Sequence, residues 1–130
     1  MKRFPIIAII CFSLLYMGTT RIDAHHSATM FDQTRTITLQ GVVKEWQLTN
    51  PHSWLLVEVT KDGKKTVWGF EAEGPSTLQR AGIRPSDLKV GTKVTITGNP
   101  MRDGTPAAIW VKAVREDGTE LNPRAGFAVK

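Results

Sequence analysis

The alternation of apolar and polar residues along the chain predicts five short β-strands. We expect them at residues 36–48, 53–60, 66–73, 92–98 and 107–115. The second range shows the pattern most clearly, because Leu55, Val57 and Val59 fall on one face of an extended chain. Asp62 and Gly63 lie between the second and third strands, and this pair favours a tight hairpin turn. The pattern therefore indicates an all-β domain.

One break in the alternation predicts a short helix at residues 75–81, between the third and fourth strands. Pro75 is tolerated in a first helical turn, and Gly82 follows where a helix would stop. Within the first strand the apolar positions change parity near Gly41, which predicts a bulge or sharp bend there. Three strands, a helix and two more strands are the order of a small five-stranded OB-like barrel. A β-sandwich of the same strands is the rival architecture.

The first 24 residues have the build of a secretory signal peptide. Lys2 and Arg3 precede an apolar stretch at residues 5–18, and the small residue Ala24 ends a polar stretch. The apolar stretch is shorter than the roughly 20 residues that span a bilayer. We expect cleavage after Ala24 and a periplasmic or secreted protein without an integral membrane segment; an uncleaved anchor is the alternative. The chain then divides into a signal peptide (1–24), an N-terminal segment (25–35), the barrel domain (36–121) and a C-terminal tail (122–130).

Composition and charge narrow the classes of partner. Hydrophobic residues make up 41% and charged residues 22% of the chain, as in ordinary globular proteins. The formal net charge of +5 includes three basic residues and one acidic residue of the signal peptide, so the mature chain has only a weak basic bias. We therefore expect no nucleic-acid partner. The single cysteine, Cys11, would leave with the signal peptide, which excludes disulfides and thiolate metal sites.

The chain contains three histidines, and two of them stand at the expected cleavage point. The mature sequence would begin His25-His26-Ser27, and His52 follows Asn50-Pro51 in a turn. An N-terminal histidine offers its α-amine and its ring Nδ1 to one metal ion, and a second-position histidine can also chelate. Amine and imidazole nitrogens in tetragonal geometry suit Cu(II) among the first-row divalent ions. The sequence thus predicts a copper site made by His25, His26 and His52, resembling a histidine brace. The alternative is that the paired histidines are solvated and that His52 only caps a strand.

Other polar and aromatic residues offer weaker signals. Glu71 is either part of a solvated strand face with Glu73 or a carboxylate that binds a metal or orients an imidazole. Asp32, near the N-terminal histidines, has the same option. The four tryptophans, Trp46, Trp54, Trp68 and Trp110, suit either a stacking platform on the binding face or the filling of both barrel walls, and we favour the second. No nucleophile elbow, phosphate-binding glycine loop or dinucleotide fingerprint occurs, which favours a binding protein over an enzyme.

Several short motifs together resemble a known family. They are the A-H-H-S of residues 24–27, the N-P-H of residues 50–52, the W-G-F-E of residues 68–71 and the R-D-G of residues 102–104. This combination resembles a family of small exported bacterial proteins classed as a domain of unknown function. The resemblance implies export and the domain boundaries given above, and it implies no activity.

Two functions from different classes follow from these observations. The first is an exported metal-binding protein, for copper, acting in storage, delivery or protection. The second is a metal-free binding or interaction module of the cell envelope that uses the OB-fold face. An oxidative copper enzyme is a more distant third interpretation.

Overall fold

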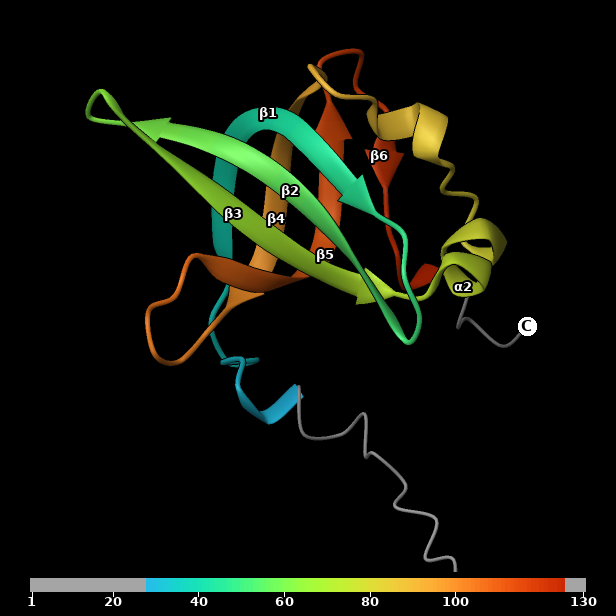
Figure 1. Cartoon of the computed structure of the whole chain (residues 1–130), viewed down its shortest axis with the longest axis horizontal. Helices are drawn as coiled ribbons and strands as arrows, with labels where there is room; N and C mark the ends of the chain where they lie inside the picture. The colour runs from blue at the N-terminus through green and yellow to red at the C-terminus, as the bar shows by residue number, and fades with distance from the viewer. Residues whose placement is uncertain (1–27, 126–130) are drawn as a thin grey trace, which may run out of the picture.

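The computed structural model describes residues 28–125 of the chain. In chain order its elements are β1 (Ile37–Gln47), β2 (His52–Lys61), β3 (Lys64–Glu73), helix α2 (Pro75–Arg80), the 3-10 turn η1 (Pro85–Leu88), β4 (Lys93–Pro100), β5 (Ala107–Arg115) and β6 (Glu120–Leu121). The five long strands lie close to the predicted ranges, and α2 lies between β3 and β4 as predicted (Figure 1). The turn η1 and the short strand β6 were not predicted.

The five long strands form one sheet that closes on itself. The strand order is β3-β2-β1-β4-β5-β6, and a parallel pairing between β3 and β5 joins the two ends of the barrel. That pairing aligns Gly69–Glu71 with Ala107–Ile109. β1 pairs with both β2 and β4, which is the feature expected of an OB-like barrel. The closure confirms the predicted fold class and excludes the β-sandwich.

Strand β1 curves strongly where it passes from one partner to the other (Figure 1). It pairs with β4 up to Val42 and with β2 from Val42 onward. A Cβ atom on Gly41 would lie 2.5 Å from the carbonyl oxygen of Glu58, so only glycine lets the two backbones approach this closely. The register shift lies between Val43 and Glu45. The bulge therefore lies beyond Gly41, whereas the bend predicted near Gly41 is confirmed, and the glycine there lets the backbone of β2 approach closely.

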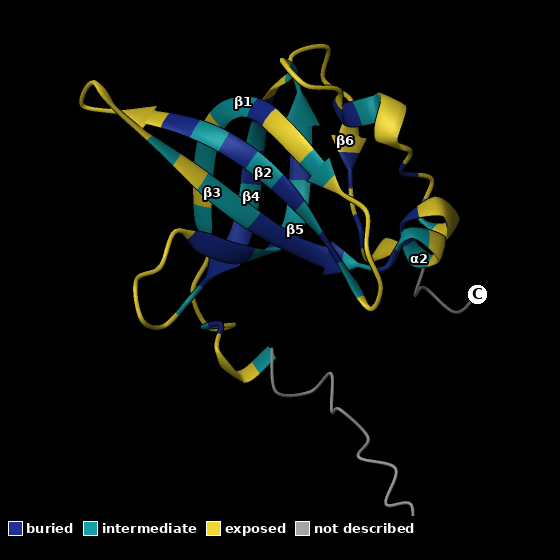
Figure 2. Ribbon diagram, in the orientation of Figure 1, coloured by how far each residue is buried: buried dark blue, intermediate teal, exposed yellow. Residues whose placement is uncertain are grey.

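Register shifts in the β1–β2 and β4–β5 pairings direct the side chains of Trp46 and Trp110 toward the core. The shift in β1 places Trp46 opposite the buried Leu55, and a second shift, between Thr97 and Gly98 of β4, places Trp110 on the inner wall. Trp110 is 1% exposed, and Trp46 packs against the core from its edge. The core runs along the barrel interior and reaches the inner side of α2 and η1 (Figure 2).

The segments before β1 and after β6 both pack on the barrel. Phe31, only 2% exposed, forms an isolated β-bridge with Met101 in the β4–β5 loop. At the other end Pro123 is fully buried, which attaches the start of the predicted C-terminal tail to the barrel. Residues 1–24, for which a signal peptide is predicted, and His25, His26 and residues 126–130 lie outside the described residues. Within residues 28–125, no helix has the length and apolar character to span a membrane.

Candidate functional site

The turn between β1 and β2 holds His52 at the start of β2. The Thr49 hydroxyl donates a hydrogen bond of 2.6 Å to the carbonyl oxygen of His52, and the Asn50–Pro51 peptide bond is cis. The turn lies against the backbone at Gly74, where a Cβ atom would come within 2.5 Å of the Asn50 side-chain oxygen. These contacts fix the exposed turn that carries His52 at the end of the barrel.

The imidazole of His52 is hydrogen-bonded to a buried carboxylate. Its Nδ1 pairs with Oε1 of Glu71, and the two side chains are 23% and 9% exposed. Because an ionised carboxylate only accepts hydrogen bonds, we assign the proton to Nδ1, which leaves Nε2 as the nitrogen that can bind a metal. Glu71 is thus not part of a solvated strand face. It takes the other option that the sequence left open, that of a carboxylate that orients an imidazole.

His52 and Glu71 line a cavity of about 290 Å³. Three parts of the chain meet around it: the barrel strands, the N-terminal segment and the segment after β6. Its lining residues include Ala28, Gln33, His52, Glu71, Trp110 and Arg124. The first described residue of the chain, Ala28, therefore lies at the same cavity as His52.

The β4–β5 loop holds the N-terminal segment in this place. The backbone N–H of Asp32 donates to the carbonyl of Pro100 (2.8 Å), and the backbone N–H of Arg102 donates to the carbonyl of Met30 (2.9 Å). The Arg102 side chain adds a hydrogen bond of 3.2 Å to the carbonyl of Thr29. The sequence analysis named Arg102 only as part of the R-D-G motif and gave it no role. Phe31, the buried aromatic residue that anchors the segment, was the signal available in the sequence.

Asp32 does not join the His52 cavity as a ligand. Its carboxylate accepts hydrogen bonds from the hydroxyl (2.6 Å) and the backbone N–H (3.1 Å) of Thr34, and Arg102 lies 3.9 Å away. The Thr34 hydroxyl, opposed in part by desolvation and helped by Arg102, lowers the pKa of Asp32 below its usual value. Asp32 fixes the turn before β1, which makes its role one of local structure.

The structure brings together one of the three predicted metal ligands and its partner Glu71. His25 and His26 lie outside the described residues, so their positions are not established. Among residues 28–125, no group of three or more His, Cys, Asp or Glu side chains is arranged to hold a metal ion.

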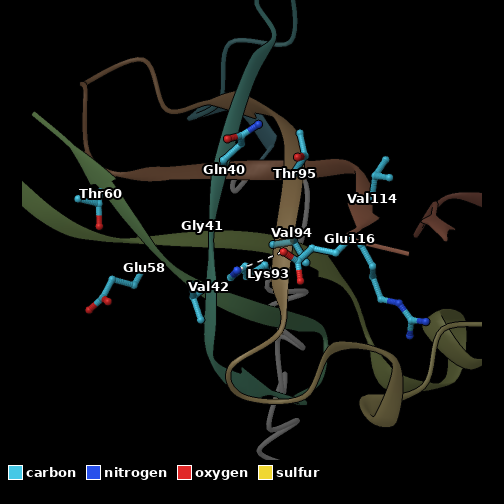
Figure 3. A pocket seen from close by; sticks show the side chains of 11 residues that line it. Gln40, Gly41, Val42, Glu58, Thr60, Lys93, Val94, Thr95, Val114 and Glu116 are labelled. Atoms are coloured by element: carbon cyan, nitrogen blue, oxygen red, sulfur yellow. Dashed lines mark ion pairs between the residues drawn. The ribbon is translucent and has the colours of Figure 1, made fainter. Parts of the chain in front are cut away.

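A second cavity, of about 380 Å³, lies on the outer wall where β1 crosses between its partners (Figure 3). Gly41 forms its floor, and Glu58, Lys93 and Glu116 are among its lining residues. Its charges pair with one another or with neighbours, as in the Lys93–Glu116 ion pair of 3.2 Å and the Lys65–Glu58 pair of 3.2 Å. This groove thus presents mixed charge and no field of one sign.

The tryptophans do not form the stacking platform considered above. Trp110, inside the barrel, packs against Trp46 at the edge of the core, with ring centroids 5.7 Å apart. Trp68 stacks on Phe70 at 6.4 Å, and Trp54 covers Gly69 on the outer wall. Most of this aromatic surface is therefore used in packing.

Comparison with known proteins identifies the family to which the chain belongs. Neither the curated proteins nor the solved structures contain a match to this chain. One family model matches residues 14–110, a range that includes His25, His26, His52 and Glu71. The chain therefore belongs to the family of unknown function DUF6152.

Proposed function

We propose that the mature protein is an exported copper-binding protein whose ligands are His25, His26 and His52. The observation that carries the proposal is the position of Ala28 at the cavity lined by His52 and Glu71. Cleavage after Ala24, which the sequence favours, would make His25 the first residue and free its α-amine. Copper would then be held between the start of the chain and the start of β2.

The reach of the N-terminal residues supports this arrangement. An extended chain covers about 3.3–3.6 Å per residue, so His26 lies within roughly 7 Å and His25 within roughly 10 Å of Ala28 along the chain. The bridge between Phe31 and Met101 and the hydrogen bonds to Arg102 hold the segment that follows. Few backbone conformations need to be fixed for the histidines to meet His52, which keeps the entropic cost of closing the site small.

The chemistry of the donors favours copper over other ions. An α-amine and imidazoles are nitrogen ligands, and Cu(II) binds such ligands more strongly than the other divalent ions of the first row. The contact from Glu71 holds His52 in one tautomer and one orientation, as carboxylates commonly do for metal-binding histidines. The mature chain would contain no cysteine, so a thiolate site for zinc is excluded.

The test is a Cu(II) titration of protein whose first residue has been fixed as His25 by intact-mass measurement. We expect one ion per chain, and a large loss of affinity in His52→Ala. Thr60→Ala, at an exposed position near the other end of β2, is the control and should bind as wild type does. Equal binding by wild type and His52→Ala would show that His52 is only a turn residue.

The groove at Gly41 favours a second candidate, a metal-free binding module of the cell envelope. Its polar lining and internally paired charges suit a neutral polar ligand better than a charged one. Substitution of Thr95, which lines this groove, by Trp should then abolish ligand binding and leave any copper binding unchanged. This candidate would be favoured if the wild-type protein retained an envelope saccharide and Thr95→Trp did not.

A further inference from the structure

We propose that the open edge of β3, at residues Lys64–Trp68, binds an extended acidic segment of a partner protein as an additional strand of the sheet. This edge begins at the hairpin turn after Lys61, whereas His52 stands at the other end of β2. The docking edge is thus separate from the proposed copper site and does not depend on it.

The closure of the barrel leaves the first half of β3 without a neighbour on one side. β3 pairs with β2 along its whole length, but its pairing with β5 covers only Gly69–Glu71. On the β5 side, the backbone N–H of Gly69 donates to the carbonyl of Pro106 at 3.0 Å. Alternate residues of a strand direct their backbone groups to the same side, so those of Lys65 and Val67 point to this side as well. Within residues 28–125 no strand pairs with them there, and their N–H and C=O groups are open.

The hairpin that carries this edge extends away from the rest of the barrel (Figure 1). Its tip is exposed on both strands, from Thr60 to Lys65 (Figure 2). Val67 is 47% exposed, although it is an apolar residue in the middle of a strand. The side chains along the open edge are therefore accessible to a partner.

Two lysines at the tip lack an acidic partner. Lys61 and Lys64 are directly opposite each other in the register, so their like charges lie on one face of the hairpin. Within the described residues neither forms an ion pair, whereas Lys65 lies 3.2 Å from Glu58. Like charges directly opposite each other destabilise a hairpin, and a carboxylate beside them offsets this repulsion. On a strand added next to β3, the residue opposite Lys64 has this position.

The charge of the hairpin decides between an acidic partner and a second copy of this chain. Lysines on an exposed edge are a common device against the pairing of identical edges. Two copies paired along Lys64–Trp68 would bring their hairpin lysines close together. A partner segment with a carboxylate opposite Lys64 and an apolar residue opposite Val67 instead matches both side chains. Main-chain hydrogen bonds then supply the affinity, and these two contacts supply the specificity.

The test uses the naturally processed protein and a blocked seven-residue peptide that alternates aspartate and valine. In an extended peptide this alternation places carboxylates on the face of Lys64 and valines on the face of Val67. Calorimetry measures binding, and NMR follows hydrogen exchange at single amides. We expect binding that weakens as salt is added, and slower exchange at the N–H groups of Lys65 and Val67. A peptide with proline at each valine position has the same charge but lacks those N–H donors, and it should not bind.

Two variants separate strand addition from attraction between charges alone. Val67→Pro removes an N–H that points to the open edge, where proline is tolerated, and it should abolish binding. Val67→Thr keeps that N–H and is the matched control. Lys61→Gln combined with Lys64→Gln should weaken binding about 3–10-fold, because two exposed ion pairs are lost. This double variant should be at least as stable as wild type, since the opposed charges are gone.

Three results would overturn the proposal. One is equal binding of the proline-containing peptide, which would leave only attraction between charges. Another is a dimer of the chain in which the amides of Lys65 and Val67 are protected without peptide, because a second copy would then occupy the edge. The last is failure of the aspartate–valine peptide to bind at millimolar concentration, whatever the affinity of the same sample for copper. If Val67→Pro does not fold, the two peptides and the double lysine variant still decide the question.

Discussion

The imidazole of His52 is hydrogen-bonded to the carboxylate of Glu71, although the two residues are not directly opposite each other in the sheet. His52 pairs across β2 and β3 with Glu73, and Glu71 pairs with Trp54. The contact is therefore a diagonal one, which long side chains on neighbouring strands can make. It places a buried acceptor behind the ring and directs the other ring nitrogen away from it.

This relationship predicts the effect of Glu71→Gln on the proposed copper site. A neutral amide no longer holds His52 in one tautomer, so the affinity for Cu(II) should fall by about 10–100-fold. Glu73→Gln is the matched control, because Glu73 lines the same cavity but, within the described part of the chain, its carboxylate makes no hydrogen bond to the His52 ring. Titration followed by electron paramagnetic resonance measures both. Equal affinities for the two variants would contradict the orienting role of Glu71.

The anchoring of the N-terminal segment predicts a large stability effect at Phe31. Phe31→Ala removes a ring that is 2% exposed, and we expect the free energy of unfolding to fall by about 3–5 kcal/mol. Met30→Ala, at a neighbour that is half exposed, should change it by no more than about 0.5 kcal/mol. Chemical denaturation measures both. A small effect at Phe31 would mean that residues 28–35 are only loosely attached to the barrel.

Close packing at Gly41 predicts the consequence of adding a single methyl group. In Gly41→Ala the new Cβ would meet the Glu58 carbonyl oxygen at 2.5 Å and a methyl group of Val57 at 2.6 Å. Neither strand can yield without losing its pairing, so we expect a loss of roughly 1–3 kcal/mol or more of stability. Gly69→Ala would meet only the ring edge of Trp54, at 3.1 Å, and should cost less. A larger drop in the melting temperature for Gly69→Ala than for Gly41→Ala would contradict the close approach of β1 and β2 at Gly41.

The lowered pKa of Asp32 predicts how part of the free energy of unfolding changes in acid. Its pKa is lowered in the folded protein by the Thr34 hydroxyl and Arg102, so its stabilising effect is present above about pH 4 and is lost as the pH falls further. The difference in free energy of unfolding between wild type and Asp32→Asn should therefore shrink between neutral pH and about pH 3. A constant difference for Asp32→Asn would exclude the charge of Asp32 as the cause.

The sequence predicted the barrel because its core strands alternate regularly. Leu55, Val57 and Val59 are buried as their parity requires, and Pro75 and Gly82 bracket the one helix between β3 and β4. These signals are local, since each depends only on residues close together along the chain.

The inward turn of the two tryptophans could not be predicted in the same way. Trp46 and Trp110 have the parity of outer-wall residues, and register shifts beside Lys44 and Val111 bring them inside. Each shift depends on how a strand meets its partner, and no residue in the strand itself marks it. The sequence nevertheless favoured the correct general role for the tryptophans, that of packing.

Two residues of the candidate site, His52 and Glu71, could be identified from their residue types alone. His52 and the option for Glu71 follow from their chemistry, but the burial of Glu71 depends on the covering segments that carry Ala28 and Arg124. Those segments lie far apart in sequence from β3, and only the folded chain brings them together.

The most direct test of the account compares two proteins that differ by one residue. One begins at His25, and the other retains Ala24 and so moves the α-amine away from the first histidine. Electron paramagnetic resonance of each, loaded with one equivalent of Cu(II), reports the nitrogen ligands, while a competition titration gives the affinity. The account predicts that the protein beginning at His25 binds copper more tightly and with a different spectrum. Identical spectra and equal affinities would show that the N-terminal amine is not a ligand, and would contradict the proposed site.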